Sequence, residues 1–449
     1  MKIKSLLTQA ALGTMLLFTW NGFSQNPIIR TQYTADPSAR VFNNRVYLFP
    51  SHDIPPYTNK NKENWFSMED YHVFSSDNLT DWKDHGMIVT QNKVPWVKPD
   101  SYSMWAPDCI ERNGKYYFYF PSTPKDTLIA KGFTIGVAIA EKPEGPYRVL
   151  PEPIKNVKGI DPNVFIDKDG QAYLYWSQGN IYGAKLKENM IELASEPVIF
   201  NNLPEKGLKE GPYLFERNSI YYLTYPHVEN KIERLEYAMG NNPLGPFKVS
   251  GVIMDEAANG CWTNHHSIIN FKKQWYLFYH NNDLSPKFDK NRSVRIDSLT
   301  FNTDGTIKKV IPTLRGVGIT PAKSNIQIDR YSSLSDNGVT VEFLDATDAF
   351  KGWKTVLAAP KAFVSYEGVD FGSKKLKKIL VQAKAPSGGT IEVRTDKPDG
   401  ALLGKVNITP GTNWNTTKAS LLKFEPGIHS IYVISEKGTP VEIDWITFE

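Results

Sequence analysis

Five stretches of the chain repeat the same order of polar and apolar positions. In each one, a polar residue at a turn is followed by a short run of aromatic and β-branched residues, and such runs predict buried β-strands. One tyrosine marks each run. The runs and their tyrosines are Val46–Phe49 (Tyr47), Tyr116–Tyr119 (Tyr117), Ala172–Tyr175 (Tyr173), Ile220–Tyr225 (Tyr222) and Trp275–Tyr279 (Tyr276).

The marker tyrosines follow one another at intervals of 70, 56, 49 and 54 residues. Units of roughly 50 residues, built from short strands and Gly, Asn or Asp turns, are typical of a β-propeller. An array of β-sandwiches would also show regularly spaced turns and is the alternative. Long helical periodicity is absent, so we expect an all-β protein.

A second domain is predicted where the aromatic repeat stops, after Thr320-Pro321. We therefore assign residues 25–322 to the propeller and residues 323–449 to a β-sandwich of the jelly-roll kind. The second part consists of short alternating runs separated by polar turns, such as Lys378–Ala383 and Ser430–Ile434.

Residues 1–24 have the layout of a secretory signal peptide. Lys2 and Lys4 precede an apolar stretch from Leu6 to Trp20, and small residues follow before Gln25. We expect the mature protein to be secreted or periplasmic, with no membrane span.

The charge and the cysteine content give no indication of several classes of function. The chain has 52 basic and 48 acidic residues, a net charge of +4, which gives no indication of nucleic-acid binding. Its 2 cysteines form neither a disulfide framework nor a metal-site spacing.

Acidic residues occupy matching places before four of the aromatic runs, namely Asp36, Asp108, Asp161 and Glu210. In a closed propeller these side chains would face one axial cavity. Carboxylates gathered in one cavity repel each other, and that cost suggests a function. Alternatively, the Asp-Pro and Gly-Pro steps serve only as turns.

Glycosidic bond cleavage uses such a set of carboxyl groups. One protonated acid serves the leaving oxygen, and one ionised carboxylate serves the anomeric carbon. A third carboxylate nearby can raise the pKa of the acid.

Four motifs together resemble glycoside hydrolase family 43, a family of five-bladed propeller enzymes that invert the anomeric configuration. The motifs are Ala35-Asp36-Pro37, Ser103–Asp108, Gly159–Asn163 and Lys209–Pro212, and the resemblance covers roughly residues 30–315. It implies that Asp36 is the general base, Glu210 the general acid and Asp161 the residue that tunes the acid. Inversion would place Asp36 and Glu210 about 6.5 to 9.5 Å apart.

The same resemblance implies that Arg292 reaches the active site, with Arg295 as the alternative. It also implies that His265 lies beneath the catalytic centre, near a calcium ion or a bound water. His265 is therefore both a candidate substrate contact and the candidate metal ligand, although a histidine hydrogen-bonded in the core is the alternative. No redox or nucleotide cofactor is implied, and a structural calcium is the one metal that the resemblance suggests.

Further substrate contacts are expected from Trp105, Asp108, His52 and Asp53. Trp105 could stack on a sugar ring, and the three polar residues could bind hydroxyl groups. Packing is the alternative for Trp105.

Residues 324–449 resemble a family 6 carbohydrate-binding module, through Ser387–Asp396, the loop around Trp414 and the ending Gly427–Trp445. Trp414 and Tyr366 are the candidate sugar-stacking residues. A purely structural support is the alternative.

These features predict a secreted, monomeric exo-glycosidase that acts with inversion. The expected substrates are plant polysaccharides or oligosaccharides, from which it would remove arabinofuranose or xylose. Endo-action, a retaining fructosidase-like enzyme and a non-catalytic glycan-binding propeller are the alternatives.

Overall fold

A computed structural model describes residues 25–55, 64–204, 206–373 and 375–449. Regular structure within these residues consists of β-strands and two short 3-10 helices, at Gln91–Lys93 and Ala349–Lys351. The predicted all-β class is confirmed. None of the helices in this part of the chain has the length and apolarity needed to cross a membrane. The predicted signal peptide, residues 1–24, lies outside the described residues.

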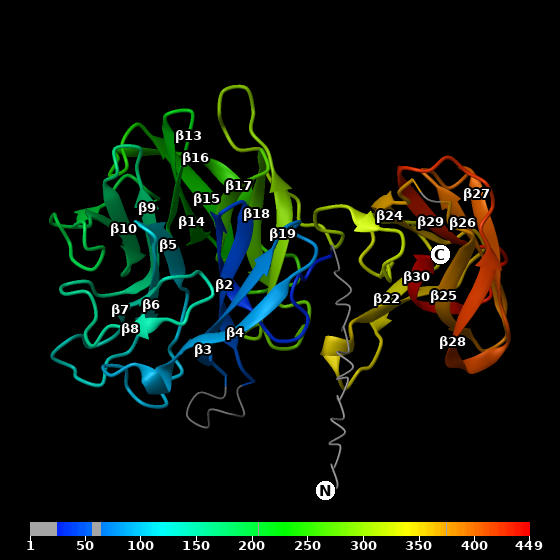
Figure 1. The fold of residues 1–449 in the computed structure, drawn as a ribbon, viewed down its shortest axis with the longest axis horizontal. Helices are drawn as coiled ribbons and strands as arrows, with labels where there is room; N and C mark the ends of the chain where they lie inside the picture. The colour runs from blue at the N-terminus through cyan, green and yellow to red at the C-terminus, as the bar shows by residue number, and fades with distance from the viewer. Residues whose placement is uncertain (1–24, 56–63, 205, 374) are drawn as a thin grey trace, which may run out of the picture.

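The N-terminal part forms five antiparallel sheets, each built from strands that are consecutive in sequence (Figure 1). Sheet one contains β1 (Ala35–Phe42), β2 (Arg45–Asp53), β3 (Met68–Ser76) and β4 (Lys83–Thr90). Sheet two contains β5 (Asp108–Arg112), β6 (Lys115–Ser122), β7 (Thr134–Ala140) and β8 (Arg148–Val149).

Sheet three contains β9 (Ile160–Ile166), β10 (Ala172–Ser177), β11 (Ile181–Lys185) and β12 (Val198–Ile199). Sheet four contains β13 (Tyr213–Arg217), β14 (Ile220–Val228), β15 (Glu233–Gly240) and β16 (Phe247–Met254). Sheet five contains β17 (Ser267–Phe271), β18 (Gln274–Asn281) and β19 (Ser293–Leu299).

The five sheets contact one another in a cyclic order. The first strand of each sheet contacts that of the next, and β17 returns to β1. Each neighbouring pair of sheets also shares one buried apolar cluster, and the fifth cluster joins sheet five to sheet one. Apolar burial is the main favourable term in folding, so the repeated aromatic runs hold the ring together.

The marker tyrosines all lie on the second strand of their sheet, not on the strand nearest the centre. The preceding polar residues lie at or just before the first strand. Asp36, Asp108 and Asp161 are within β1, β5 and β9, whereas Glu210 and His265 lie shortly before β13 and β17. The strands that meet at the centre are therefore the ones that precede the aromatic runs.

Asp108 corrects one expectation, since its carboxylate connects three sheets and does not line the pocket described below. It forms an ion pair with Arg40 of β1, accepts a hydrogen bond from Ser38 Oγ at 2.6 Å, and accepts another from Val164 N of β9 at 2.7 Å. Both carboxylate oxygens are occupied by protein donors, so Asp108 has no oxygen to offer a substrate.

We expect Asp108→Ala to destabilise the fold by about 3 kcal/mol, because it leaves the Arg40 charge buried without its partner. Asp77→Ala is the control, since Asp77 pairs with Arg45 on the exposed surface and such pairs contribute less than about 1 kcal/mol. Urea unfolding monitored by tryptophan fluorescence measures both. Equal losses from the two substitutions would show that Asp108 is not a structural clamp.

The C-terminal part contains two further sheets. One contains, in spatial order, β20 (Thr320–Pro321), β24 (Phe363–Asp370), β29 (Ile428–Ser435), β26 (Gly389–Thr395) and β27 (Leu402–Ile408), with β21 (Ser333–Leu334) beside β24. The other contains β22 (Val339–Phe343), β23 (Trp353–Leu357), β30 (Val441–Phe448), β25 (Lys378–Ala385) and β28 (Gly411–Ser420).

Both C-terminal sheets contribute to one apolar cluster, with Val364 and Val433 from one sheet and Val381 and Ile443 from the other. Tyr366, a predicted sugar-stacking residue, is part of this cluster and is fully buried, with Arg315 over its ring at 4.4 Å. That prediction is corrected, because no face of the ring is open to a ligand. Trp414 on β28 is half-buried, and the Lys384 ammonium lies 5.1 Å from the centre of its ring.

Candidate active site

A pocket of about 180 Å³ lies where the chain enters the first strands of the five sheets. All five sheets contribute to it, which explains why its residues are so far apart in sequence. Its lining residues are Asp36, Trp65, Phe66, Met68, Trp105, Ala106, Ile160, Asp161, Glu210, Glu233, Trp262, Thr263, His265 and Arg292. The three predicted catalytic residues are therefore brought together.

Two of the acids sit on backbone in the left-handed region, with φ of 45° at Asp36 and 57° at Asp161. Few residues other than glycine adopt this conformation, and it is concentrated at functional sites. The pairing register of β1 with β2 shifts between Ala35 and Ser38, and that of β9 with β10 shifts beside Ile160. Such irregularities redirect side chains near active sites.

Asp36 is held as an ionised carboxylate. Arg292 donates to both of its oxygens, at 2.8 and 3.2 Å, and Ser51 Oγ donates to one at 2.8 Å. Burial alone would raise the pKa of Asp36, but the charge of Arg292 and the other donors lower it to about 2. The group is therefore a base over the whole neutral range.

Arg292 is fixed by a second carboxylate, Asp53. Its Nε and one terminal nitrogen each donate to Asp53 at 2.9 Å, and its backbone N–H donates at 2.8 Å. Asp53 thus positions the arginine and does not line the pocket itself. The alternative arginine, Arg295, turns away and pairs with Asp283 at 3.0 Å.

Glu210 contrasts with Asp36, because the pKa of Glu210 is raised well above its ordinary value. Burial is the largest cause, followed by the charge of the neighbouring Glu233 carboxyl. Burial also raises the pKa of Glu233, to about 7, even though Asn264 N donates to it at 2.7 Å. Glu210 therefore retains its proton at neutral pH.

Asp161 is tied to the backbone beside Glu210, because Gly211 N donates to its carboxylate at 2.9 Å. Burial and the charge of Glu210 raise the pKa of Asp161 well above its usual range. Gly211 has φ of 51°, and a Cβ there would come within 3.0 Å of His265 Nδ1 and of the Pro226 ring. Only glycine allows this close approach.

Aromatic rings form the remaining wall of the pocket. Phe66 and Trp262 stack with ring centres 6.0 Å apart, and Trp105 meets Phe66 edge-on at 6.0 Å. Trp105 Nε1 is buried and has no hydrogen-bond partner within the protein. Aromatic faces opposite charged groups suit a sugar, which has both apolar C–H faces and hydroxyl groups. The volume is below the range of drug-sized sites and fits a small ligand.

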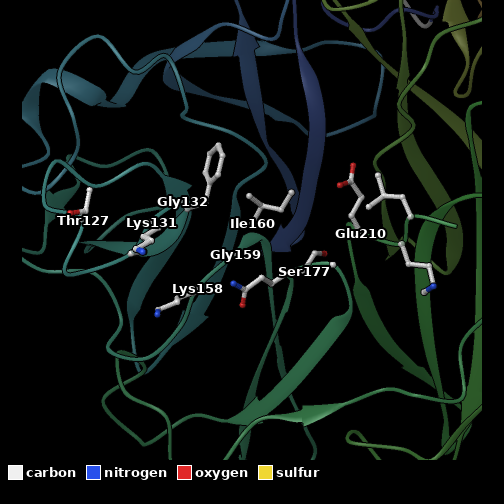
Figure 2. A pocket seen from close by; sticks show the side chains of 14 residues that line it. Thr127, Lys131, Gly132, Lys158, Gly159, Ile160, Ser177 and Glu210 are labelled. Carbon is white, nitrogen blue, oxygen red and sulfur yellow. The ribbon is translucent and has the colours of Figure 1, made fainter. Parts of the chain in front are cut away.

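A second, larger cavity of about 630 Å³ adjoins the first and shares Ile160 and Glu210 with it. Figure 2 shows Glu210 on the opposite side of this cavity from Thr127 and Lys131. Gly159, Ser177 and Gln178 line the floor between them. Glu210 therefore stands at the junction of a small pocket and a larger one.

The two histidines predicted for the site, His52 and His265, differ in position. His52 does not line the pocket, and its Nδ1 lies 2.7 Å from Asp70 Oδ1. His265 lines the pocket, but within the described residues it joins no group of three His, Cys, Asp or Glu side chains able to hold an ion. Calcium prefers oxygen ligands, so an ion beside His265 would take most of its ligands from other groups, and the calcium site stays a prediction.

Sequence reasoning missed Glu233 and His280. His280 Nδ1 accepts the backbone N–H of Asp36 at 3.0 Å, and burial lowers the pKa of His280 to about 3, so the ring is neutral. Neither residue belongs to the repeated motifs. His280 directly follows the fifth aromatic run, and that position is the one signal in the sequence.

Two family profiles match this chain. The profile of the family described as Glycosyl hydrolases family 43 matches residues 24–307, and that of Carbohydrate binding module (family 6) matches residues 334–449. A xylosidase/arabinosidase 43A of Humicola insolens is 36% identical over 332 residues, which is 63% of this chain and 98% of that protein.

Two solved structures extend the comparison. A β-xylosidase/α-arabinofuranosidase from a compost metagenome, CoXyl43, crystallised with xylotriose in a calcium-free form, has a TM-score of 0.57 at 33% identity. The match covers 64% of this chain and 98% of that one. An arabinoxylan arabinofuranohydrolase from Bacillus subtilis has a TM-score of 0.56 at 24% identity over 95% of this chain and 97% of that one, and so shares the fold.

Proposed function

This chain belongs to glycosyl hydrolases family 43, and from its pocket we propose an inverting, exo-acting enzyme that releases xylose or arabinofuranose from plant glycans. The glycoside hydrolase class is given by the family and by relatives that are xylosidases and arabinofuranohydrolases. We propose further that the five sheets are the blades of a propeller and that the C-terminal sheets form a jelly roll.

The separation of protonation states carries the proposal. One carboxylate, Asp36, has its pKa lowered to about 2, while Glu210 has its pKa raised well above the ordinary value. Two titratable groups whose surroundings push their pKa values apart identify the base and the acid of a site. The opposite pKa shifts of Asp36 and Glu210 arise with both side chains in the positions described above.

In this mechanism Asp36 accepts a proton from a water molecule, which attacks the anomeric carbon. Glu210 gives its proton to the glycosidic oxygen, so that the leaving sugar departs as a neutral alcohol. Arg292 keeps Asp36 ionised, and the neutral His280 holds the Asp36 backbone. Each bond that breaks is therefore served by one of these side chains.

Asp161 and Glu233 act through Glu210. Asp161 fixes the peptide that follows Glu210, through the hydrogen bond from Gly211 N. Glu233 opposes the ionisation of Glu210 through its own charge. Together these contacts keep Glu210 protonated and fix its position, which is the role expected for a modulating carboxylate.

The two cavities support exo-action. The small pocket holds Asp36 and the aromatic wall, and fits a single terminal sugar. The larger pocket begins at Glu210 and is therefore placed to receive the leaving part of the chain. Xylose or arabinofuranose as the terminal sugar follows from what the related enzymes cleave.

The C-terminal domain is proposed to bind glycan through Trp414, and the enzyme is proposed to be an exported monomer. The match to a carbohydrate-binding module supports the first part. Export rests on the signal-like N-terminus alone.

Glu233→Gln is expected to shift the alkaline limb of the kcat/KM profile to lower pH. Removing a negative charge beside Glu210 favours its ionisation, so the pKa of Glu210 falls. Activity requires protonated Glu210 and is therefore lost at a lower pH. The acidic limb should stay in place, because it reports Asp36. An unchanged alkaline limb would remove Glu233 from the mechanism.

The substrate proposal is tested with 4-nitrophenyl β-D-xyloside, α-L-arabinofuranoside and β-D-galactoside, followed by xylo-oligosaccharides of increasing length. We expect cleavage of one or both pentosides and release of single sugars from the chain end. Cleavage of the galactoside alone, or the appearance of internal fragments first, would contradict it.

A further inference from the structure

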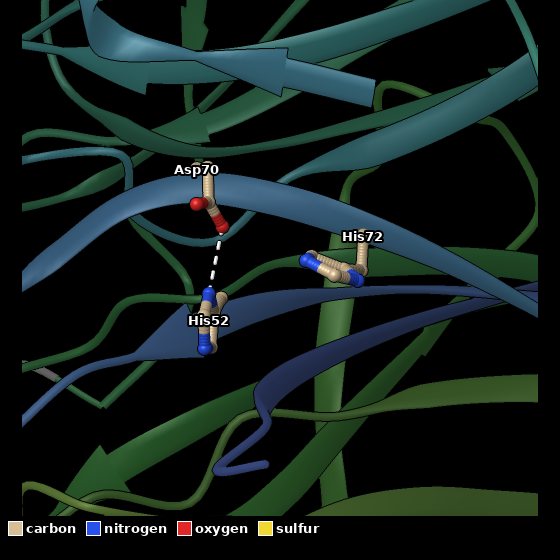
Figure 3. A group of neighbouring side chains, drawn as sticks. All are labelled: His52, Asp70 and His72. Carbon is tan, nitrogen blue, oxygen red and sulfur yellow. Dashed lines mark hydrogen bonds and ion pairs between the residues drawn. The ribbon is translucent and has the colours of Figure 1, made fainter. Parts of the chain in front are cut away.

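A cluster of metal-ligand side chains lies outside the catalytic pocket, on the hairpin of β2 and β3. It consists of His52 on β2 and of Asp70 and His72 on β3 (Figure 3). Ser51 pairs with Tyr71 in the register of the two strands. The register shifts between Ser51 and Asp53, and within this irregularity His52 Nδ1 lies 2.7 Å from Asp70 Oδ1. His72 lies two residues beyond Asp70 on the same strand.

The three side chains are close enough to share one ion. One ligand atom from each lies within 4.8 Å of the other two, and the histidine ring centres are 5.3 Å apart. The side chains are 14 to 20% exposed, so the cluster is sheltered but open to solvent. Figure 3 shows the His72 ring pointing toward the His52–Asp70 pair.

A fourth residue fixes the orientation of His72. Asp84 on β4 places both carboxylate oxygens 3.2 Å from His72 Nδ1. Asp84 is itself held by the backbone N–H of Gly86 at 2.7 Å. A histidine whose Nδ1–H is bound by a carboxylate keeps Nε2 free as a lone-pair donor, which is the arrangement found behind metal-ligating histidines.

We propose that His52, Asp70 and His72 bind a zinc ion, with Asp84 as the carboxylate that supports His72. Two imidazoles and one carboxylate form a donor set suited to zinc, and solvent completes the coordination. The two nitrogen ligands make calcium a poor match. The two cysteines are buried elsewhere and offer no competing thiolate site.

The proposed zinc site shares strand β2 with residues that support the catalytic base. Ser51 and Asp53, on either side of His52, hold Asp36 and Arg292 respectively. Both of these residues are buried, whereas the His52 side chain between them is 20% exposed. Zinc would therefore clamp β2 to β3 directly behind the base, without contacting substrate.

The test uses the full chain, stripped of metal with a chelator and titrated with Zn²⁺ in competition with a chromophoric chelator. We expect one equivalent of tight binding, which is lost in the His52→Ala/His72→Ala double variant. Asp84→Asn should weaken binding about 10- to 100-fold, since it removes the supporting carboxylate. Circular dichroism confirms that each variant is folded.

His429→Ala is the matched control. His429 also lies beside a carboxylate, with Nδ1 2.9 Å from Asp396, but it belongs to no group of three such side chains among the residues described. Its loss should leave the stoichiometry unchanged. The proposal is overturned if wild-type protein binds no zinc, if the double variant retains the same equivalent, or if millimolar Ca²⁺ displaces the zinc.

Discussion

Asp36→Asn is expected to lower kcat by about 10²- to 10⁴-fold, the usual contribution of a general base. Asparagine has nearly the same shape as aspartate but cannot accept the proton of the attacking water. The loss should be as large on 4-nitrophenyl glycosides as on xylo-oligosaccharides, because water must be activated for either leaving group. Steady-state kinetics on both substrate types measure this.

The fold should tolerate Asp36→Asn, since Arg292 keeps its two side-chain hydrogen bonds to Asp53. An unchanged melting temperature would establish this. Asp77→Asn, on the exposed surface, serves as the kinetic control. A variant that is folded and retains more than about a tenth of wild-type kcat would exclude Asp36 as the base.

Glu210→Gln is expected to give the second large effect, with a different dependence on substrate. On xylo-oligosaccharides kcat should fall about 10²- to 10⁴-fold, because the departing sugar oxygen needs a proton. On 4-nitrophenyl glycosides the loss should be no more than about tenfold, since nitrophenolate leaves without protonation. The ratio of the two losses is the quantity to compare.

A pH profile of Glu210→Gln adds an independent measurement. The alkaline limb reports the raised pKa of Glu210 and should disappear with the 4-nitrophenyl substrate, whereas the acidic limb should remain. Equal losses on both substrates, with both limbs retained, would mean that Glu210 is not the acid.

Much of the fold could be predicted because buried strands require runs of apolar residues, and such runs are easily recognised in the sequence. The five aromatic runs occur where neighbouring sheets share apolar clusters, and turns separate them. The central strands were harder to recognise. They carry Asp36, Asp108 and Asp161 among mixed polar and apolar positions, so the more apolar second strands give the clearer signal.

The site could be predicted only where a motif repeats. Asp36, Asp161 and Glu210 share a place relative to the aromatic runs, and the structure brings them into one pocket. Asp108 has the same place but faces the Arg40 guanidinium. Sequence position identifies a residue near the axis, but the partners contributed by other sheets decide whether its oxygens are free.

Other roles depended on contacts between distant segments. Asp53 was expected to touch substrate, yet it holds an arginine 239 residues later in the chain. Glu233 becomes relevant only because the fold sets it beside Glu210. Tyr366 showed the pattern of a strand residue, and only packing between the two C-terminal sheets reveals that it is buried.

The stereochemistry of the first product tests the central claim most directly. Hydrolysis of 4-nitrophenyl β-D-xyloside or α-L-arabinofuranoside, followed by proton NMR from the first minutes, reports the anomer before mutarotation. An inverting pair, Asp36 with Glu210, predicts that α-xylose or β-arabinofuranose forms first. Initial release of β-xylose or α-arabinofuranose would instead require a nucleophilic carboxylate and a covalent intermediate, and would contradict the account.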